Sequence, residues 1–535
     1  MKKIFRIIAA CSVFFLGVSS CYLFTGGSES EPDIVGEQWT KNSDWLFLFY
    51  FDADNNLNDD IYLNMKEAEY SLSLMRNEDG TAKDGFPSVN MVLLWDGASE
   101  KQMRENSLLY KHPDGAIYEL GADTTVSYYE YDDAYGTGQL INLGTEFSVS
   151  KNTQEIKTSW LSKEPDMADY KTLKNFLIWA NAHYKAENVV LCLANHGAGT
   201  YKEIYSNINS FSRSQRTVCY DDTSTSNKAI TALNIKNALE AAVYTGENQI
   251  DVIWMDACLQ STVEIANILS GSASYLLASP NTSVSHDYVH AFKNFSSTMT
   301  PEDFGKIMVS EYYQKYYENP FPSDELSSSG VSMYTMSLIS LDEERISKMN
   351  EAVDAFADEL LALKNTDFDA FNKIYKNYLK QYEIDEEDVE SSKIYEEHKG
   401  LVYEGSYVYL ADVGYFANDI VQNYEGSLKS AAEAVLDSLD SSKDGVLVYC
   451  WGGKRGITVS SRKNAWSKQT ENQMYLTGGK DFISGETIET ELSGDFYGIT
   501  ITTQEIYKQL NCTGNYNNFT GYSSKWGRVI AAWNN

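Results

Sequence analysis

Positively charged residues are scarce in this sequence. Its 535 residues include 43 Lys and Arg against 76 Asp and Glu, which gives a formal net charge of −33. Binding to nucleic acid phosphates requires clustered Lys and Arg side chains, so this composition argues against a nucleic acid partner. The excess of acidic groups is most simply a solvated surface, although such a surface could also attract basic substrates.

Long apolar runs are also missing, since no stretch beyond the first twenty residues is long and apolar enough for a membrane helix. At the N-terminus, three basic residues precede the apolar residues 7–18, as in a signal peptide. The following Val18-Ser-Ser-Cys21 resembles a bacterial lipobox. We therefore predict that Cys21 is lipidated and that the protein is anchored in the bacterial cell envelope, exposed at the surface. An ordinary signal peptide cut near Ser20 is the alternative.

Closely spaced cysteine pairs are absent. Beyond the N-terminal region the cysteines are Cys192, Cys219, Cys258, Cys450 and Cys512. Without a Cys-x-x-Cys spacing, they argue against a zinc site and against a dense disulfide framework. Cys192 lies inside an apolar run, so we expect it in the core. Two of Cys219, Cys450 and Cys512 could form a disulfide, which the sequence does not decide. The odd number of cysteines in an exported protein indicates a free thiol that could be reactive.

An acidic segment, Asp52-Ala-Asp-Asn-Asn-Leu-Asn58, follows the first expected strand. It does not match the calcium-binding EF-hand loop, because Leu57 stands where that loop needs Gly and Leu63 where it needs a bidentate Glu. We expect these polar side chains to cap the next helix and to line the edge of the sheet. No metal ligands are predicted from the residues themselves.

Two short apolar runs each end in a residue with a reactive side chain. Residues 188–200 contain His196, and residues 250–261 contain Cys258. Such runs are typical of buried parallel strands, whose functional groups lie just beyond their carboxyl ends. Helical patterns at 169–184 and 259–269 give the strand–helix alternation of a doubly wound α/β sheet. We therefore expect His196 and Cys258 at the same edge of one sheet.

A Cys–His pair at a sheet edge favours nucleophilic catalysis. A nearby His and a helix N-terminus both increase the thiolate fraction of a cysteine, and we expect Cys258 to have both. His196 would then protonate the leaving group. The backbone N–H groups of Gly197 and Cys258 are the candidates for an oxyanion site. Either motif alone is common in turns and cores, so the prediction depends on the two together.

Several segments together resemble the clostripain family of cysteine peptidases, which belongs to the caspase-like clan. The segments that carry this resemblance are Trp45–Leu57, Glu164–Asp169, Asn195-His-Gly-Ala-Gly199, Asp221–Ser224 and Asp256-Ala-Cys258, with weaker likeness at Gly456–Val459 and Ser523–Trp526. The resemblance implies a caspase-like α/β/α sandwich with a mostly parallel sheet. It also implies that Cys258 is the nucleophile and His196 the acid/base of a peptidase that acts on proteins or peptides.

The resemblance extends to specificity and activation. Family members cleave after Arg or Lys, using acidic side chains in the S1 pocket; Asp256 matches one such position and Asp287 is a looser candidate, while helix capping is the alternative for Asp256. Self-cleavage between the His and Cys motifs is implied as well, with Lys202, Arg213 and Arg216 as candidate sites in a polar loop. Calcium dependence occurs in the family.

The expected domain organisation follows the changes in pattern along the chain. It comprises a lipoprotein signal peptide (1–20), a flexible tether (21–43), a caspase-like catalytic domain (44–300), a helical region (301–400) and an α/β or β-rich C-terminal region packed on the catalytic domain (401–535). Residues 480–535 indicate β hairpins, and residues 97–160 indicate hairpins or a surface insertion.

Two other functions remain open. The chain could be a surface lipoprotein that uses the fold as a binding or scaffold module without turnover. It could also use the same Cys–His pair to cleave after non-basic residues. Labelling of Cys258 and a comparison of substrates with different P1 residues separate these hypotheses.

Overall fold

The computed structural model describes residues 33–98, 115–129, 139–144, 146–197, 218–224, 229–280, 283, 286, 288–313, 336–378, 401–404, 407–450, 457–462, 473–477, 495–496, 499–502 and 525–533. Residues 34–535 form one compact unit. Within the ranges just given, none of the helices combines the length and the apolar character needed to cross a membrane.

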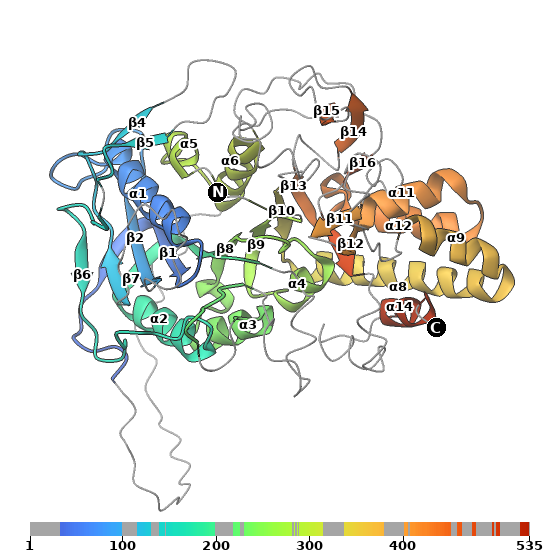
Figure 1. Cartoon of the computed structure of the whole chain (residues 1–535), viewed down its shortest axis with the longest axis horizontal. Coiled ribbons are helices and arrows are strands. Elements are labelled where there is room, and N and C mark those ends of the chain that lie inside the picture. Colours follow the sequence, from blue (N-terminus) through green and yellow to red (C-terminus); the bar gives the residue numbers. More distant parts are fainter. Residues whose placement is uncertain are drawn as a thin grey trace, which may run out of the picture. The chain divides into compact units, whose positions relative to one another are not determined.

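A nine-stranded sheet organises the described residues (Figure 1). Its strands are β1 (Lys41–Ala53), β2 (Val89–Gly97), β3 (Ala116–Glu119), β6 (Gln154–Ile156), β7 (Tyr184–Ala194), β8 (Ile250–Asp256), β9 (Ala273–Ala278), β10 (Ser337–Ser340) and β13 (Leu447–Cys450). They are arranged in the order β13-β10-β9-β8-β7-β1-β2-β3-β6. The run from β9 to β2 is parallel. The outer strands on both sides pair antiparallel.

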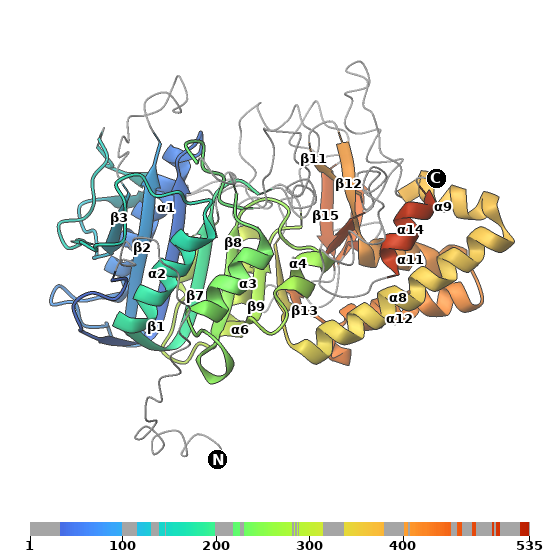
Figure 2. The same ribbon diagram turned by 90° about the horizontal axis from the view of Figure 1, so that it is seen from below.

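Helices cover both faces of this sheet. One face carries α1 (Asn58–Met75), α5 (Tyr288–Lys293) and α6 (Pro301–Tyr313), and the other carries α2 (Tyr170–His183), α3 (Ala232–Ala241) and α4 (Val263–Ile268). Figure 2 shows α2, α3 and α4 in front of the strands. The predicted fold class, an α/β/α sandwich with a mostly parallel sheet, is therefore confirmed.

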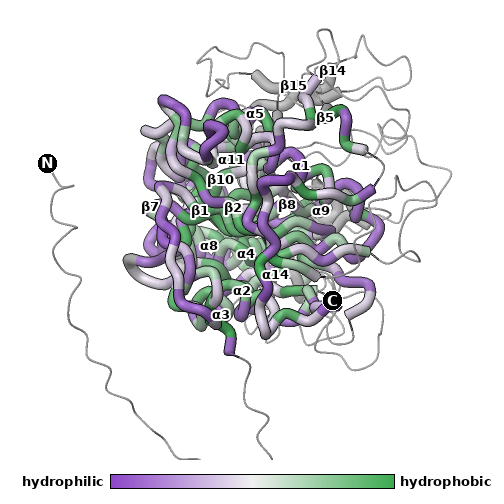
Figure 3. Tube along the Cα trace, turned by 90° about the vertical axis from the view of Figure 1, so that its left-hand side faces the viewer, coloured by the Kyte–Doolittle hydropathy of each residue, from purple (hydrophilic) through white to green (hydrophobic). Residues whose placement is uncertain are grey.

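The alternation of side chains along β1 explains the two layers, because successive residues of a strand point to opposite faces. Trp45, Phe47, Phe49 and Phe51 pack in the cluster that includes α1, α5 and α6. Leu46, Leu48 and Tyr50 pack in the cluster that includes α2, α3 and α4. A strand buried on both faces has the continuous apolar sequence seen here. In Figure 3 the hydrophobic stretches gather in the middle of the view, with hydrophilic stretches around them.

Segments beyond residue 300 extend the same core. β10 and β13 join the sheet beside β9, so both the region predicted as helical and the C-terminal region contribute to it. The helices are α8 (Glu343–Thr366), α9 (Phe368–Tyr378), α11 (Val413–Asn423), α12 (Ser427–Leu439) and α14 (Trp526–Trp533). Of these, α8 contacts α9, α12 and α14, and side chains from α8, α11, α12 and α14 belong to the same hydrophobic cluster as α2 and α3.

The remaining strands form small sheets. These are β11 (Leu401–Glu404) with β12 (Tyr407–Asp412) and β17 (Thr500–Thr502), β14 (Ile457–Arg462) with β15 (Gln473–Thr477) and β16 (Asp495–Phe496), and the hairpin of β4 (Ser127–Tyr129) with β5 (Gln139–Ile141). The hairpins expected in 480–535 are therefore only partly seen, since β16 and β17 pair with strands outside that range and α14 is a helix. The insertion expected at 97–160 supplies both a hairpin and the edge strands β3 and β6.

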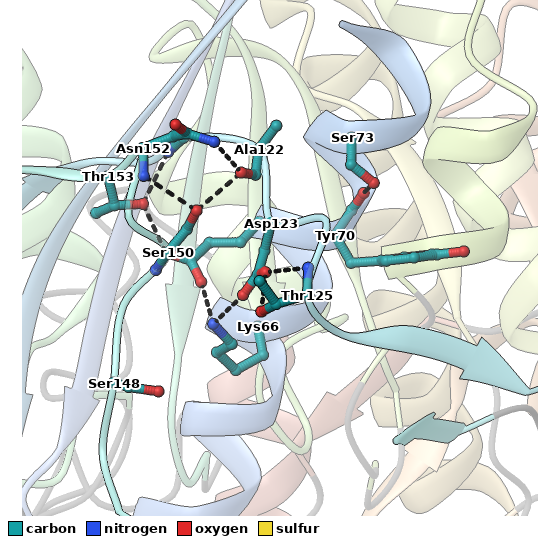
Figure 4. Close-up of polar contacts among 12 residues, drawn as sticks. Lys66, Tyr70, Ser73, Ala122, Asp123, Thr125, Ser148, Ser150, Asn152 and Thr153 are labelled. Carbon is teal, nitrogen blue, oxygen red and sulfur yellow. Dashed lines mark hydrogen bonds and ion pairs between the residues drawn. The ribbon is translucent and has the colours of Figure 1, made fainter. Parts of the chain in front are cut away.

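A buried ion network ties α1 to the segments around residues 123 and 150. The Lys66 ammonium lies 2.5 Å from the Glu69 carboxylate and 2.6 Å from the Asp123 carboxylate, and these side chains are at most 3% exposed. Glu69 also accepts hydrogen bonds from the Ser150 N–H and the Thr153 hydroxyl. Figure 4 shows Lys66 and Asp123 facing each other inside this network. Burial lowers the pKa of Lys66, but its carboxylate partners outweigh burial and raise it above the usual value.

The N-terminal part of the described chain packs on the domain. β1 begins at Lys41, inside the range predicted as a flexible tether, and the Trp39 ring contacts the rings of Trp179, His183 and Tyr184. The segment from Trp39 onward therefore belongs to the folded unit.

The described cysteines, Cys192, Cys219, Cys258 and Cys450, are all free. The disulfide left open between Cys219 and Cys450 is thus not formed, and Cys512 lies outside the described residues. Cys192 is buried in β7, as predicted. Burial raises the pKa of the Cys192 and Cys219 thiols well above the usual range, which keeps them protonated and unreactive. Cys258 is half-buried.

Candidate active site

The structure places His196 and Cys258 at the same edge of the sheet. Strands β7 and β8 run parallel and pair up to Ala194 and Asp256. One residue further, the Asn195 N–H donates to the Asp256 carbonyl at 3.2 Å. Each reactive residue comes two positions after its last paired strand residue, so parallel pairing brings both to one edge.

The glycine after His196 packs directly on Cys258. A Cβ atom at Gly197 would lie 2.1 Å from the Cys258 carbonyl oxygen and 2.8 Å from the Cys258 nitrogen. Only a residue without a side chain allows this approach of two backbones. Gly197 also pairs with Val218 in an antiparallel bridge. The backbones carrying the proposed oxyanion donors, Gly197 and Cys258, are therefore in contact.

The sulfur of Cys258 faces the backbone of Ser283, in the segment after β9. The Ser283 N–H donates to the sulfur at 3.2 Å, and the Ser283 hydroxyl lies 3.9 Å from it. The thiol can in turn donate to the Ser283 carbonyl at 3.5 Å. An N–H group directed at sulfur stabilises negative charge there. Ser283 could not be singled out from the sequence, because it lies in a polar segment without a motif.

The helix expected immediately after Cys258 does not start there. Leu259 has a left-handed φ of 62°, and α4 begins only at Val263, with the Thr262 side chain accepting from the Ile265 N–H as its N-cap. The prediction that a helix N-terminus activates Cys258 is therefore wrong, as is the alternative that Asp256 caps that helix. A buried Leu in a left-handed conformation is strained, and such strain is typical of functional turns.

His196 is held by Asn56, from the loop between β1 and α1. Its Nε2–H donates to the Asn56 side-chain oxygen at 2.8 Å, and a proton on Nε2 leaves Nδ1 as the basic nitrogen. The neighbouring Asn195 is anchored too, because its side-chain oxygen accepts from the Tyr220 N–H at 3.0 Å and its side-chain N–H donates to the Asp52 carbonyl. Asn56 belongs to the acidic segment 52–58, which we expected only to cap the next helix and to line the edge of the sheet.

The Asp256 carboxylate lies in a polar network beneath the site. Its Oδ2 accepts from the Asn64 amide and the Tyr288 hydroxyl, both at 3.1 Å. Its Oδ1 lies 3.5 Å from Nε2 of His286, and the Trp254 indole donates to the other His286 nitrogen at 2.6 Å. Asp256 is 7% exposed. The network therefore fixes the carboxylate two residues before Cys258.

The model of the clostripain family matches residues 50–533. The chain belongs to the clostripain family. Clostripain of Hathewaya histolytica is 25% identical over 234 residues, which cover 42% of this chain and 36% of that protein. The match thus spans only about a third of the relative's length.

Solved structures of clostripain-family proteins are also similar. An inactive zymogen C11 protease from Parabacteroides distasonis is 14% identical and has a TM-score of 0.46, with 91% of this chain and 98% of that chain covered. A secreted C11 cysteine protease from Bacteroides thetaiotaomicron, in complex with an irreversible peptide inhibitor, is 13% identical and has a TM-score of 0.46, with 89% and 99% covered.

Some of the site residues predicted from the family resemblance lie outside the described residues. These are Asp287, the candidate self-cleavage residues Lys202, Arg213 and Arg216, and the candidate lipidation residue Cys21. In the sequence, Asp287 lies between the described residues His286 and Tyr288. Lys202, Arg213 and Arg216 lie between the described residues Gly197 and Val218.

An acidic cluster lies at the same edge of the sheet, at the ends of β1 and β2. Burial raises the pKa of Asp52 and Asp96 well above the usual range and that of Asp54 to about 7, and nearby carboxylates contribute in the same direction. The Asp221 pKa is raised by burial as well. One carboxylate oxygen each from Asp54, Asp96 and Glu164 lies within 4.8 Å of the others. Carboxylate oxygens are the donors that hard cations such as Ca²⁺ prefer, so these residues fit the ion that the family resemblance implies.

The role predicted for the acidic segment is only half right. Asp52 and Asp54 do line the sheet edge, but the N-cap residue of α1 is Leu57, and no side chain caps this helix. The two aspartates instead face carboxylates from other parts of the chain.

Proposed function

We propose that this chain is a cysteine peptidase with Cys258 as nucleophile and His196 as acid/base. The contact of Gly197 with the Cys258 backbone carries the proposal, because it joins the His-Gly turn to the nucleophile. Membership of the clostripain family supports the reaction type. The Ser283 N–H at the sulfur and the Asn56 oxygen at His196 prepare the two groups for their roles.

The reaction proceeds by acyl transfer. The Cys258 thiolate attacks the carbonyl carbon of the scissile peptide bond, and backbone N–H groups of Gly197 and Cys258 stabilise the oxyanion. His196, protonated at Nδ1, gives that proton to the leaving amine and then accepts one from the water that hydrolyses the thioester. Asn56 holds the imidazole by Nε2 through both steps.

We infer cleavage after Arg or Lys as the specificity. Asp256 lies two residues before the nucleophile and its carboxylate can bind a guanidinium or an ammonium group, with Asp287 as the second candidate acid. Against this, two hydrogen bonds already engage one Asp256 oxygen. Cleavage after a non-basic residue is therefore the outcome that the substrate comparison must exclude.

We also propose that the mature chain is lipid-anchored through Cys21 and acts at the bacterial cell surface on proteins or peptides. The basic residues and apolar stretch before a Val-Ser-Ser-Cys segment support this location. Incorporation of radiolabelled palmitate, lost on substitution of Cys21 by Ala, tests it.

The decisive experiment is covalent labelling of the full chain with an arginyl chloromethyl ketone, followed by mass spectrometry and peptide hydrolysis assays. We expect the label on Cys258, and the Cys258→Ala variant to lose both label and hydrolysis. Cys450→Ala is the matched control and should keep both, because Cys450 is buried in β13.

Three outcomes contradict parts of the proposal. Hydrolysis that persists in Cys258→Ala rules out the nucleophile. A folded wild-type chain without label and without hydrolysis of a broad peptide library supports a non-catalytic binding module instead. Equal rates on Arg, Ala and Asp P1 substrates, unchanged in Asp256→Asn, rule out the basic specificity but leave the chemistry intact.

A further inference from the structure

His286 is buried beneath the candidate active site, between aromatic rings and the Asp256 carboxylate. The imidazole and the Trp254 ring are nearly parallel, at 6°, with their centroids 5.8 Å apart. The Tyr312 ring of α6 meets the imidazole edge-on, with 5.0 Å between the centroids. The His286 side chain is inaccessible to solvent. Its protonation state is therefore set by the protein groups that contact it.

The Trp254 indole determines which nitrogen of His286 carries the proton. Its Nε1–H donates to Nδ1 of His286 at 2.6 Å. An indole nitrogen can only donate, so Nδ1 must accept and carries no proton while this bond exists. The one proton of the neutral imidazole is then on Nε2, the nitrogen that lies 3.5 Å from Oδ1 of Asp256. The indole thus holds His286 in one neutral tautomer.

The other titratable groups around this pair come from α5, α6 and β7. Tyr288 of α5 donates to Oδ2 of Asp256 at 3.1 Å, and its hydroxyl lies 3.6 Å from the Cys192 sulfur of β7. Burial raises the pKa of Tyr288 and of the Cys192 thiol well above their usual ranges, so both stay protonated near neutral pH. On α6, Glu311 accepts from an asparagine amide at 3.0 Å. Asn64 of α1, the second donor to Oδ2, is uncharged.

We propose that Trp254 and His286 are positioning residues that keep the Asp256 carboxylate ready for a basic P1 side chain by denying His286 a second proton. This inference rests on the proposed role of Asp256 in cleavage after Arg or Lys. A doubly protonated His286 would be a cation 3.5 Å from Oδ1 of Asp256. It would compete with the guanidinium or ammonium group of the substrate for that oxygen. The buried indole excludes this competitor, so binding of the P1 side chain does not depend on titration of His286.

The test compares Trp254→Phe with the wild type on a peptide with Arg at P1, from about pH 8.5 to about pH 5.5. Phe keeps an aromatic ring but lacks the N–H, so His286 can take a second proton, as an imidazole ordinarily does around pH 6.5. We expect the ratio of KM values, variant to wild type, to rise about tenfold as the pH falls through this range. The ratio of kcat values should stay constant. Dividing by the wild-type value at each pH removes the titration of His196 and Cys258.

Two further variants separate this effect from a loss of packing. Trp45→Phe is the matched control, because Trp45 is buried in the same hydrophobic cluster as Trp254 and loses the same atoms. Its KM ratio should not change with pH. The double variant Trp254→Phe/His286→Gln should also give a constant ratio, because a glutamine amide does not titrate. A peptide with citrulline at P1, which lacks the charge of Arg, should give a constant ratio in every variant.

The tautomer of His286 gives a second readout that requires no turnover. Nitrogen NMR of the Cys258→Ala chain with isotope-labelled histidine should show an unprotonated Nδ1 and a protonated Nε2 at both ends of the pH range. The His286→Gln substitution in this background identifies the signals. When Trp254→Phe is added to Cys258→Ala, both nitrogens of His286 should be protonated at the acidic end.

Three results would overturn the inference. A proton on Nδ1 of His286 while Trp254 is present contradicts the tautomer. A constant KM ratio in folded Trp254→Phe, or a pH-dependent ratio that persists in the double variant, shows that His286 is not the competing group. When the wild type still prefers Arg over citrulline, these results leave the proposed function intact. Equal wild-type rates on the two peptides instead contradict the basic specificity, and with it the role of His286 in P1 recognition.

Discussion

Asn56 is the residue on which the protonation state of His196 depends. Its oxygen accepts the Nε2 proton at 2.8 Å, so Nδ1 is the nitrogen that exchanges protons with Cys258 and the leaving group in the proposed reaction. Asn56 lies in the segment Trp45–Leu57 that resembles the family, but nothing in its residue type indicates a partner of His196; the loop between β1 and α1 places it at the imidazole.

Asn56→Ala should lower kcat about tenfold and change KM little, because it removes orientation of the imidazole and no substrate contact. Asn56→Asp keeps an acceptor oxygen and should retain more activity. Its carboxylate should also raise the pKa of His196, which moves that limb of the kcat profile to higher pH. Steady-state kinetics across pH measure both effects.

Asn423→Ala is the control, since Asn423 is exposed and its side chain hydrogen-bonds to Asp419 within α11. A pH profile in Asn56→Asp that matches the wild type would contradict the positioning role, even if kcat fell in both variants.

Gly197→Ala should reduce kcat/KM by about 100-fold or more, since displacements of about 1 Å in an active site have effects of this size. The added Cβ would lie 2.1 Å from the Cys258 carbonyl oxygen, so one backbone must move. Gly80→Ala is the control for backbone strain away from the site, because a Cβ there has no neighbour within 4 Å but Gly80 has a φ of +83°, so this variant should lose some stability and keep its kcat/KM. Kinetics and thermal unfolding of both variants separate the effects. Unchanged kcat/KM in folded Gly197→Ala would show that the contact is irrelevant to turnover.

At the scale of elements, the buried Lys66 network should be the part of α1 most sensitive to substitution. Lys66→Met leaves two buried carboxylates without their cation, and breaking a buried ion pair in this way costs about 3–5 kcal/mol. Lys157→Met removes an exposed pair with Glu155, whose side chains are 82% and 42% exposed, and should cost less than about 1 kcal/mol. Denaturant unfolding measures both. Equal losses would mean that burial does not control the stability of this network.

Sequence patterns predicted the elements whose burial is complete. β1, β2, β7 and β8 are apolar on both faces, so their positions followed from composition alone. The helix after Cys258 was predicted wrongly because residues 259–269 also fit a helical period. The Thr262 cap directly before Val263 was the signal for the later start.

The acidic cluster and Ser283 could not have been predicted in the same way. Asp96 and Glu164 approach Asp54 only through the register of β1 with β2 and the position of α2. An aspartate at the end of an apolar strand, as in Leu93-Leu-Trp-Asp96, was the one visible signal, and its meaning depends on the neighbouring strand. Contacts across the sheet edge are set by tertiary structure, which local periodicity does not encode.

For the whole molecule, a cut between His196 and Cys258 should not separate the two catalytic residues. β7 and β8 pair from Val190 to Ala194, and their side chains share the two hydrophobic clusters. The candidate cleavage residues lie in the segment 198–217. The residues on either side of this segment, Gly197 and Val218, pair with each other in a bridge beside the site. Two chains produced by a cut in this segment would therefore remain one folded unit.

We expect the purified wild-type chain to cut itself after Lys202, Arg213 or Arg216 and to give two bands on a denaturing gel but one peak in size-exclusion chromatography. N-terminal sequencing identifies the bond. Cys258→Ala should stay intact, while Cys450→Ala is processed like the wild type. Because the segment starts next to His196, cleavage should be intramolecular, with a rate constant unchanged by tenfold dilution. Processing of purified Cys258→Ala, or a rate that falls in proportion to dilution, would show that another molecule makes the cut.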